Sequence, residues 1–150
     1  MTKKPQPEDN KINESLKDQL KVKRGVDGLG LFSESPIKKG EYIIEYWGPL
    51  LNDEEVEQKG GQYLFEVKKN VTIDGTHRAN TARYINHSCR PNCEVSIKKG
   101  RVLIYTKKAI KPGEELGYDY GKEFWNEYIK PKGCRCVKCK EKVVLSATKQ

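Results

Sequence analysis

The sequence has no apolar run that approaches the roughly 20 residues needed to cross a bilayer. Its mean hydropathy is -0.83, and 35% of its 150 residues are hydrophobic. The first residues, Met1-Thr2-Lys3-Lys4-Pro5, lack the apolar segment of a secretory signal. We therefore expect an intracellular chain with no membrane partner, folded as one domain with tails.

Cysteine is absent from the first 88 residues and then occurs in two groups, Cys89 with Cys93 and Cys134 with Cys136 and Cys139. Thiols this closely spaced in an intracellular protein favour a metal over disulfides. Structural zinc takes four ligands in a tetrahedron. The C-terminal group supplies three, so the fourth must be Cys89 or Cys93. Three reduced surface cysteines without a metal are the alternative.

Acidic and basic residues are unevenly spread, and the net charge of +8 comes from the two ends of the chain. Residues 1–24 carry 7 basic and 4 acidic side chains, and residues 128–150 carry 7 and 1. Residues 25–127 carry 15 and 16. This distribution predicts weak nucleic-acid contact through the basic termini at most. The nearly neutral body has acidic clusters at 53–57 and 114–127, which suit a basic peptide.

The dinucleotide-binding glycine motif is also missing. Residues 27–30, Asp-Gly-Leu-Gly, resemble its start, but the third glycine is absent and no helix follows. We interpret these residues as a glycine turn that leads into Leu31 and Phe32 and lets the backbone approach a ligand or another strand closely.

The chain instead contains many short β-prone segments separated by turns. The expected strands are residues 20–23, 42–47, 63–67, 71–74, 93–97, 101–106 and 116–120. Gly100 is expected in the turn of the 93–106 hairpin. Asn52 is expected to cap a short acidic helix that ends near Gln58. Residues 1–19 are polar and lysine-rich, and they predict a disordered arm with a helical tendency near residues 14–20. These features predict a mostly β fold of small sheets.

One polar loop stands out between the apolar segments. Residues 83–93 read Arg-Tyr-Ile-Asn-His-Ser-Cys-Arg-Pro-Asn-Cys. Asn, Ser and Pro interrupt regular structure. A loop this rich in amides, imidazole and thiols is more typical of a binding or catalytic site than of packing.

Four segments in order, together with the C-terminal cysteines, resemble the SET-domain protein lysine methyltransferases. They are DGLGLF at 27–32, EYWG at 45–48, the segment 79–93 that contains RYINHSC, and GEELGYDYG at 113–121. The resemblance implies a fold of small curved sheets with a C-terminal pseudo-knot, where the third and fourth segments meet, and few short helices. It implies a SET domain at 20–121 and a post-SET zinc segment at 122–140, between the polar arm at 1–19 and a tail at 141–150. No cysteine-rich segment precedes residue 20, so no pre-SET module is expected.

The resemblance also implies the activity, which is methyl transfer from S-adenosylmethionine to a lysine side-chain amine. The expected substrate is a basic protein tail, such as that of a histone. The position-matched cofactor residues are Asp27, Gly28, Leu29, Tyr63, Asn86, His87, Tyr120 and the aromatic Phe124 or Trp125. Tyr120 is the expected tyrosine at the methyl-transfer point, and Tyr46 and Tyr118 are expected to line the lysine channel. The expected zinc ligands are Cys89, Cys134, Cys136 and Cys139, with Cys93 as the spare.

These residue types suit that chemistry. A free lysine has a pKa of about 10.4 and attacks only when neutral. Burial among aromatic rings favours the neutral amine, and the rings attract cationic groups. In the family, a tyrosine two positions before the site tyrosine favours fewer methyl groups. Tyr118 occupies that position and predicts mainly monomethylation.

Two other functions compete with this interpretation. One is a zinc-stabilised, non-enzymatic binding module, and the other is a methyltransferase for a non-histone substrate. The family implies a nuclear or chromosomal location in a eukaryote, and a cytoplasmic or host-secreted one for a bacterial protein.

Overall fold

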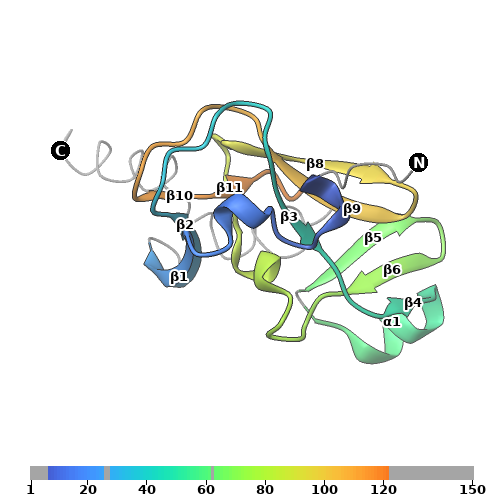
Figure 1. Cartoon of the computed structure of the whole chain (residues 1–150). Coiled ribbons are helices and arrows are strands. Elements are labelled where there is room, and N and C mark those ends of the chain that lie inside the picture. The colour runs from blue at the N-terminus through green and yellow to red at the C-terminus, as the bar shows by residue number, and fades with distance from the viewer. Residues whose placement is uncertain (1–6, 26–27, 62, 122–150) are drawn as a thin grey trace, which may run out of the picture.

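The computed structural model describes residues 7–25, 28–61 and 63–121 (Figure 1). The strands are β1 (Leu20–Gly25), β2 (Gly28–Ser33), β3 (Tyr42–Tyr46), β4 (Leu50–Leu51), β5 (Leu64–Lys68), β6 (Val71–Asp74), β7 (Asn86–His87), β8 (Cys93–Lys98), β9 (Arg101–Thr106), β10 (Glu114–Glu115) and β11 (Gly117–Tyr118). The helical elements are α1 (Asp53–Lys59) and three 3₁₀ turns, Pro7–Asp9, Glu14–Leu16 and Thr81–Tyr84. No helix in these ranges is long and apolar enough to span a membrane.

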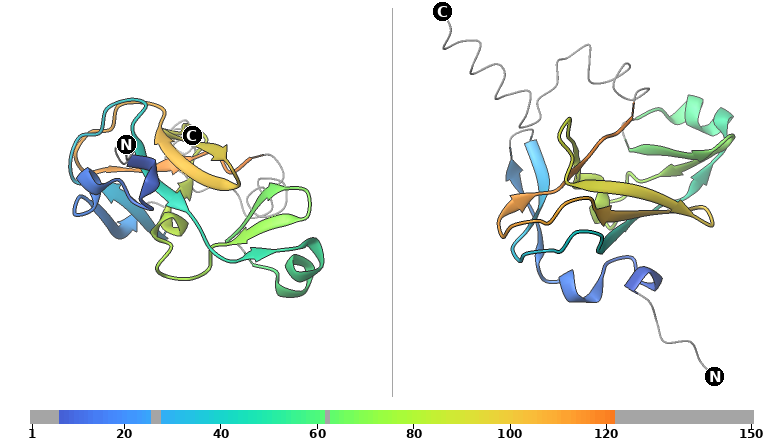
Figure 2. Two further views of the ribbon diagram at one scale, coloured as in Figure 1. Left: turned by 45° about the vertical axis from the view of Figure 1, so that its right-hand side comes forward. Right: turned by 90° about the horizontal axis from the view of Figure 1, so that it is seen from above.

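The strands form four small sheets, ordered β1-β2-β10, β3-β9-β8, β4-β6-β5 and β11-β7. The pairs are antiparallel except β7 with β11, which is parallel. The prediction of a mostly β fold of small sheets is therefore confirmed. Figure 2 shows α1 with β4, β5 and β6 at one end of the molecule and β1 with β2 at the other.

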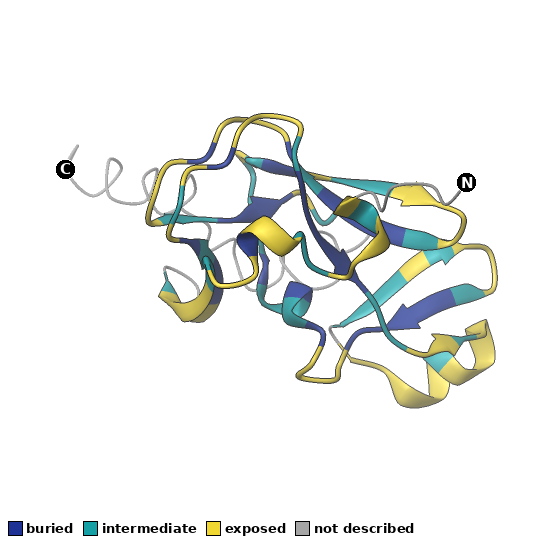
Figure 3. Ribbon diagram, in the orientation of Figure 1, coloured by how far each residue is buried: buried dark blue, intermediate teal, exposed yellow. Residues whose placement is uncertain are grey.

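The core lies where β3 and β9 cross the middle of the molecule. All five residues of β3 are buried, as are Val102, Leu103 and Ile104 of β9 (Figure 3). Strands buried on both faces are continuous apolar runs, which explains why residues 42–46 do not alternate. The Thr81–Tyr84 turn packs beneath this sheet and contributes Ala82 to the same core.

Two local predictions are confirmed in detail. The β8–β9 hairpin closes through Lys99 and Gly100, whose φ angles are 51° and 79°. Positive φ at both residues is what a two-residue type I′ turn requires. Helix α1 is capped by Asn52, whose side chain accepts from the Glu55 N–H at 2.8 Å. The Glu55 carboxylate in turn accepts from the Asn52 N–H at 3.0 Å, which completes a capping box.

The prediction of a disordered arm does not hold for residues 7–19, whereas residues 1–6 lie outside the described ranges. Ile12 forms an antiparallel bridge with Ile44 of β3. Leu16 is only 4% exposed and belongs to the core. Two apolar residues, Ile12 and Leu16, are enough to order this charged segment, because the free edge of β3 also offers it backbone hydrogen bonds.

The prediction of a glycine turn at residues 27–30 is also wrong, because residues 28–30 lie in a strand. Gly28 to Gly30 belong to β2 and pair with β1 in a register that sets Gly28 opposite Gly25. The glycine at position 30 serves a close approach, because a Cβ there would lie 2.3 Å from Oε2 of Glu115. The segment between β1 and β2 contains residues that are not described.

Candidate functional site

The third and fourth motifs meet at the parallel pair β7 and β11. Asn86 is opposite Gly117 and His87 is opposite Tyr118. The Ser88 N–H donates to the Tyr118 carbonyl at 3.0 Å. The side chain of Asn92 donates to the Glu115 carbonyl at 2.9 Å and accepts from the Gly117 N–H at 2.9 Å. The meeting of these motifs, which the expected pseudo-knot requires, is therefore confirmed.

Asn86 connects this junction to β2. Its Nδ2 donates to the carbonyl of Leu29 at 3.0 Å and to Oε2 of Glu115 at 3.0 Å. The Glu115 carboxylate lies against the backbone of Gly25 and Gly30, where neither position has room for a Cβ. Both amide hydrogens of Asn86 are thereby used. Its Oδ1 accepts no hydrogen bond from any residue that the structure describes, so it remains available as an acceptor.

Glu115 is a site residue that the sequence analysis missed. It lies in the fourth motif beside Glu114, and the two look alike in the sequence. Glu114 instead accepts from the Lys111 backbone N–H at 3.0 Å in an exposed turn. Only the pairing of β10 with β2 distinguishes them, because it aims Glu115 at Asn86.

His87 is held between Tyr120 and Cys89. The Tyr120 N–H donates to Nδ1 of His87 at 3.1 Å. In the neutral ring the hydrogen is then on Nε2, which lies 3.4 Å from the Cys89 sulfur and donates to it. Burial lowers the pKa of His87, and the nearby Asp119 carboxylate opposes this only in part. Both ring nitrogens therefore have structural partners in the neutral state.

The aromatic rings of β11 and its extension form a continuous wall. The rings of Tyr118 and Tyr120 are 4.8 Å apart, and those of Tyr120 and His87 are 5.5 Å apart. The Tyr120 hydroxyl donates to the carbonyl of Ile85. Burial raises the pKa of Tyr118 well above its ordinary value, and the phenol of Tyr120 raises it further. The Tyr118 phenol is therefore neutral at physiological pH.

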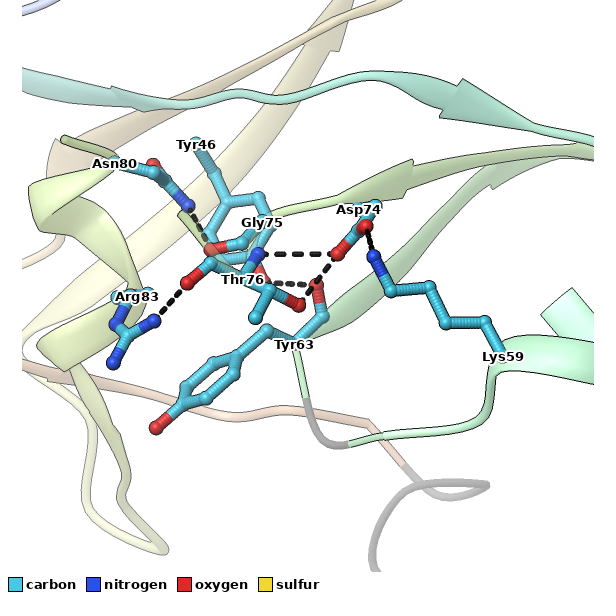
Figure 4. A network of polar contacts seen from close by, with 8 residues as sticks. All are labelled: Tyr46, Lys59, Tyr63, Asp74, Gly75, Thr76, Asn80 and Arg83. Carbon is cyan, nitrogen blue, oxygen red and sulfur yellow. Dashed lines mark hydrogen bonds and ion pairs between the residues drawn. The ribbon is translucent and has the colours of Figure 1, made fainter. Parts of the chain in front are cut away.

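Tyr46 approaches the same wall from β3. Burial and then the Tyr118 phenol raise the pKa of Tyr46. Its hydroxyl donates to the Tyr63 carbonyl at 2.6 Å, and the Gly75 N–H donates to the same oxygen at 2.7 Å (Figure 4). A Cβ on Gly75 would lie 2.4 Å from the Tyr46 ring. Tyr46 is thus fixed in one orientation by close packing and one hydrogen bond.

A polar network lies next to Tyr46 and Tyr63 (Figure 4). Asp74 pairs with Lys59 at the end of α1, and its other oxygen accepts from the Thr76 hydroxyl at 2.5 Å. Burial favours a higher pKa for Asp74, but the hydrogen bonds from Lys59 and Thr76 outweigh it and leave the pKa below its ordinary value.

Arg83 completes this network. It donates to the carbonyl of Thr76 and lies 4.5 Å from the ring centroid of Tyr63 (Figure 4). No role was predicted for Lys59, Asp74 or Arg83, because their spacing along the chain gives no signal that they lie in one network.

The predicted site residues thus fall into three sets. The structure brings together Gly28, Leu29, Asn86, His87, Tyr118 and Tyr120, with Cys89 beside His87. It pairs Tyr46 with Tyr63. The predicted residues Asp27, Phe124, Trp125, Cys134, Cys136 and Cys139 lie outside the described ranges.

The two cysteines in the described ranges differ sharply. Cys93 is 1% exposed in the core, and burial raises the pKa of its thiol to about 12. Cys89 is half-buried at the junction. Residues 7–25, 28–61 and 63–121 contain no group of three or more His, Cys, Asp or Glu that could hold a metal ion by themselves.

Comparison with known proteins agrees with the motifs. The SET domain model matches residues 28–121. Histone-lysine N-methyltransferase trithorax of Drosophila virilis is 34% identical over 143 residues, which cover 87% of this chain and 4% of the relative. Histone-lysine N-methyltransferase ASHH3 of Arabidopsis thaliana is 36% identical over 137 residues, which cover 81% of this chain and 37% of the relative.

A human relative gives the same result. Histone-lysine N-methyltransferase 2D of Homo sapiens is 34% identical over 129 residues, which cover 77% of this chain and 2% of the relative. The chain thus spans well under half the length of each of these proteins. The family model matches residues 28–121, a range that includes the motifs at the β7–β11 junction. This match shows that the chain belongs to the SET-domain family.

Proposed function

We propose that this protein is an S-adenosylmethionine-dependent protein lysine N-methyltransferase that acts on histone or histone-like tails. The observation that carries the proposal is the parallel pairing of Asn86 and His87 with Gly117 and Tyr118. This pairing puts an amide acceptor, a neutral imidazole and two tyrosines at one junction. The histone substrate is supported by the names of the relatives, which are histone-lysine N-methyltransferases.

The cofactor residues are proposed to be Gly28, Leu29, Asn86, His87, Tyr63 and Tyr120, with Asp27 and Phe124 or Trp125 from outside the described ranges. S-adenosylmethionine supplies, when bound, an electrophilic methyl group on a positively charged sulfur. The Oδ1 of Asn86 fits such a ligand, because its amide hydrogens are already used by Leu29 and Glu115 and the oxygen can accept from an ammonium group. The exposed backbone of Gly28 and Leu29 lies next to it.

The substrate lysine is proposed to lie among Tyr46, Tyr118 and Tyr120. Surroundings of buried rings disfavour the charged ammonium and so favour the neutral amine that reacts. The hydroxyl of Tyr46 donates to the Tyr63 carbonyl, so its oxygen remains able to accept from an amine N–H. The hydroxyl of Tyr120 donates to the carbonyl of Ile85, which fixes the ring beside Tyr118. Positioning two bound groups in this way lowers the activation barrier of their reaction by up to roughly 7–11 kcal/mol.

Zinc is proposed to be held by Cys89, Cys134, Cys136 and Cys139 in a post-SET segment at residues 122–140. Cys89 fits a thiolate ligand because it receives an N–H from His87, and N–H donors stabilise a ligand sulfur. The buried, high-pKa thiol of Cys93 suits the core instead. Metal analysis of the Cys89→Ser and Cys93→Ala proteins tests this choice. Zinc retained by Cys89→Ser and lost from Cys93→Ala would reverse it.

The experiment that tests the proposed function is transfer of radiolabelled methyl groups to a panel of histones and to a cell lysate. We expect a labelled histone with the wild-type protein. The Tyr120→Phe variant should lose most of its turnover but still bind the cofactor. Phenylalanine keeps the ring beside Tyr118 and His87 and removes only the hydroxyl that is expected to orient the amine. Calorimetry showing that cofactor binding is lost in a folded Tyr120→Phe protein would contradict this role.

Two other outcomes would support the alternative functions. Label on lysate proteins but on no histone would indicate a non-histone methyltransferase. Cofactor binding without transfer to any protein would indicate a non-enzymatic module. A nuclear or chromatin location follows from the proposed substrate and from the relatives' names.

A further inference from the structure

Charged side chains of one sign gather at two ends of the folded body, although its sequence is nearly neutral. Helix α1 carries Asp53, Glu54, Glu55 and Glu57 at one end. The loops that join β2 to β3 and β9 to β10 lie side by side at the other end (Figures 1 and 2). These loops carry five exposed lysines, Lys38, Lys39, Lys107, Lys108 and Lys111, which we call the lysine surface. We propose that the lysine surface binds the phosphate backbone of nucleic acid.

The two loops are mounted rigidly on each other. Ile37 and Ile110 form two backbone hydrogen bonds, of 3.0 and 2.8 Å, and both side chains are buried in the core. The Gly40 N–H donates to the Thr106 carbonyl at 3.0 Å, and the Thr106 hydroxyl donates to the Lys38 carbonyl at 2.5 Å. Because the backbone is already ordered, only lysine side chains lose freedom when a partner binds.

The positive charge of this surface is not neutralised locally. None of the five lysines forms an ion pair within the part of the chain that the structure describes. The nearest acidic residues along the chain are Glu41 and Glu114, both half-buried. The Glu114 carboxylate accepts from the Lys111 backbone N–H. The β2–β3 loop also contains Glu34, which pairs with Lys23 at 3.5 Å. Five lysines therefore outnumber three carboxylates, of which Glu34 is paired with a lysine of β1 and Glu114 is engaged with the backbone.

The composition of the surface favours phosphates over an acidic protein. Protein interfaces are anchored by aromatic and apolar residues and are depleted in lysine. The exposed large hydrophobic residues in the described ranges, Val22, Leu29, Leu50 and Ile97, lie in neither loop. Lysine alone gives point-charge contacts to phosphates with no reading of bases. The expected binding is sequence-independent and strongly salt-dependent.

The lysine surface also adjoins the site loop. The N–H groups of Lys107 and Lys108 both point at the carbonyl of Asn92, at 2.8 and 3.3 Å. Asn92 in turn binds Gly117 at the β7–β11 junction. A nucleic acid held at the lysine surface would therefore keep the junction close to proteins bound to that nucleic acid. The proposal itself does not depend on methyl transfer.

The test is fluorescence anisotropy of the full chain with a labelled duplex DNA of about 30 base pairs over a range of salt. One variant replaces Lys38, Lys39, Lys107, Lys108 and Lys111 by Gln. The matched control replaces the exposed lysines Lys17, Lys21, Lys68, Lys69 and Lys99 by Gln, which removes the same charge elsewhere. We expect the lysine-surface variant to bind at least 10-fold more weakly at low salt. The slope of log affinity against log salt should fall by up to about 4.5, since each of five phosphate contacts contributes about 0.9.

The control should stay within about 2-fold of wild type, with an unchanged slope. Equal loss in both variants, or unchanged binding by the lysine-surface variant, would overturn the proposal. Poly-glutamate that binds wild type as tightly as DNA does, through the same lysines, would identify an acidic protein as the partner and would overturn the nucleic-acid assignment. Thermal melting and near-UV circular dichroism check that each variant is folded. The binding test can therefore be interpreted whether or not the protein methylates a free peptide.

Discussion

Replacing Glu115 by glutamine tests whether this carboxylate orients Asn86 for the cofactor. Glu115 accepts from Nδ2 of Asn86 at 3.0 Å, and Asn86 makes its second bond to the Leu29 carbonyl at 3.0 Å. Gly25 and Gly30 leave the Glu115 side chain little room, because a Cβ on either would lie within 2.6 Å of its carboxylate. Glutamine has the same shape and should stay in place, so the change removes charge and not packing.

The expected magnitude follows from the strength of that bond. A hydrogen bond to a charged group contributes about 1.5–3 kcal/mol and a neutral one about 0.5–1.5, so Glu115→Gln should cost about 1 kcal/mol. That is about a fivefold weaker affinity for S-adenosylmethionine. Glu115→Ala leaves one amide hydrogen of Asn86 without a partner, which costs about 1–3 kcal/mol, or about 5- to 150-fold. The bond to Leu29 remains in both variants and limits the loss.

The assay is isothermal titration calorimetry of the full chain with S-adenosylmethionine. Glu114→Gln is the matched control, because it removes the same charge one residue away without touching Asn86. It should bind within about twofold of wild type. The reasoning is refuted if Glu115→Ala, folded and melting near the wild-type temperature, binds the cofactor as tightly as wild type does.

Three further predictions concern product, core and pH. Tyr118→Phe should raise the share of di- and trimethyl-lysine in mass spectra, and a wild-type product that is mainly trimethylated would contradict the role of Tyr118. Leu16→Ala should lower the free energy of unfolding in urea by about 2–5 kcal/mol, because Leu16 is buried in the core; a loss below about 0.5 kcal/mol would mean that the N-terminal segment is not packed. Folding lowers the pKa of Asp74 from 3.8, so its contribution to stability is present above that pH and is lost as the pH falls through the folded value. Asp74→Asn should therefore flatten the fall in stability on the acid side, measured by urea unfolding between about pH 2 and pH 6, and an unchanged acid slope would argue against the Lys59 pair.

The sequence predicted the elements that depend on neighbours a few residues apart. The β8–β9 hairpin follows from β-prone residues on both sides of Gly100, and the start of α1 follows from the capping residue Asn52. The contacts that start these elements join residues three positions apart, Asn52 with Glu55 and Lys98 with Arg101, so local chemistry decides them. That residues 83–93 meet residues 113–121 was expected only from the resemblance to the SET-domain family.

Contacts between distant residues could not be predicted in the same way. Asn86 reaches Leu29 across 57 positions and Glu115 across 29. Nothing in the sequence ranks Glu115 above Glu114. Which of the two side chains reaches Asn86 depends on the register in which β10 pairs with β2. The N-terminal segment was misjudged for a related reason. Its composition is that of a disordered chain, and only the free edge of β3 gives Ile12 a place to pair.

The pairing of the N-terminal segment with β3 decides where this domain can be shortened. The Asn13 N–H donates to the Ile43 carbonyl at 2.9 Å, and the Glu45 N–H donates to the Lys11 carbonyl at 2.7 Å. A recombinant fragment that starts at residue 20 or 28 would leave these groups bare along an apolar strand. Bare strand edges are templates for self-association. Precipitation of such a fragment would therefore report an uncovered edge, and would say nothing about whether its junction of tyrosines is intact.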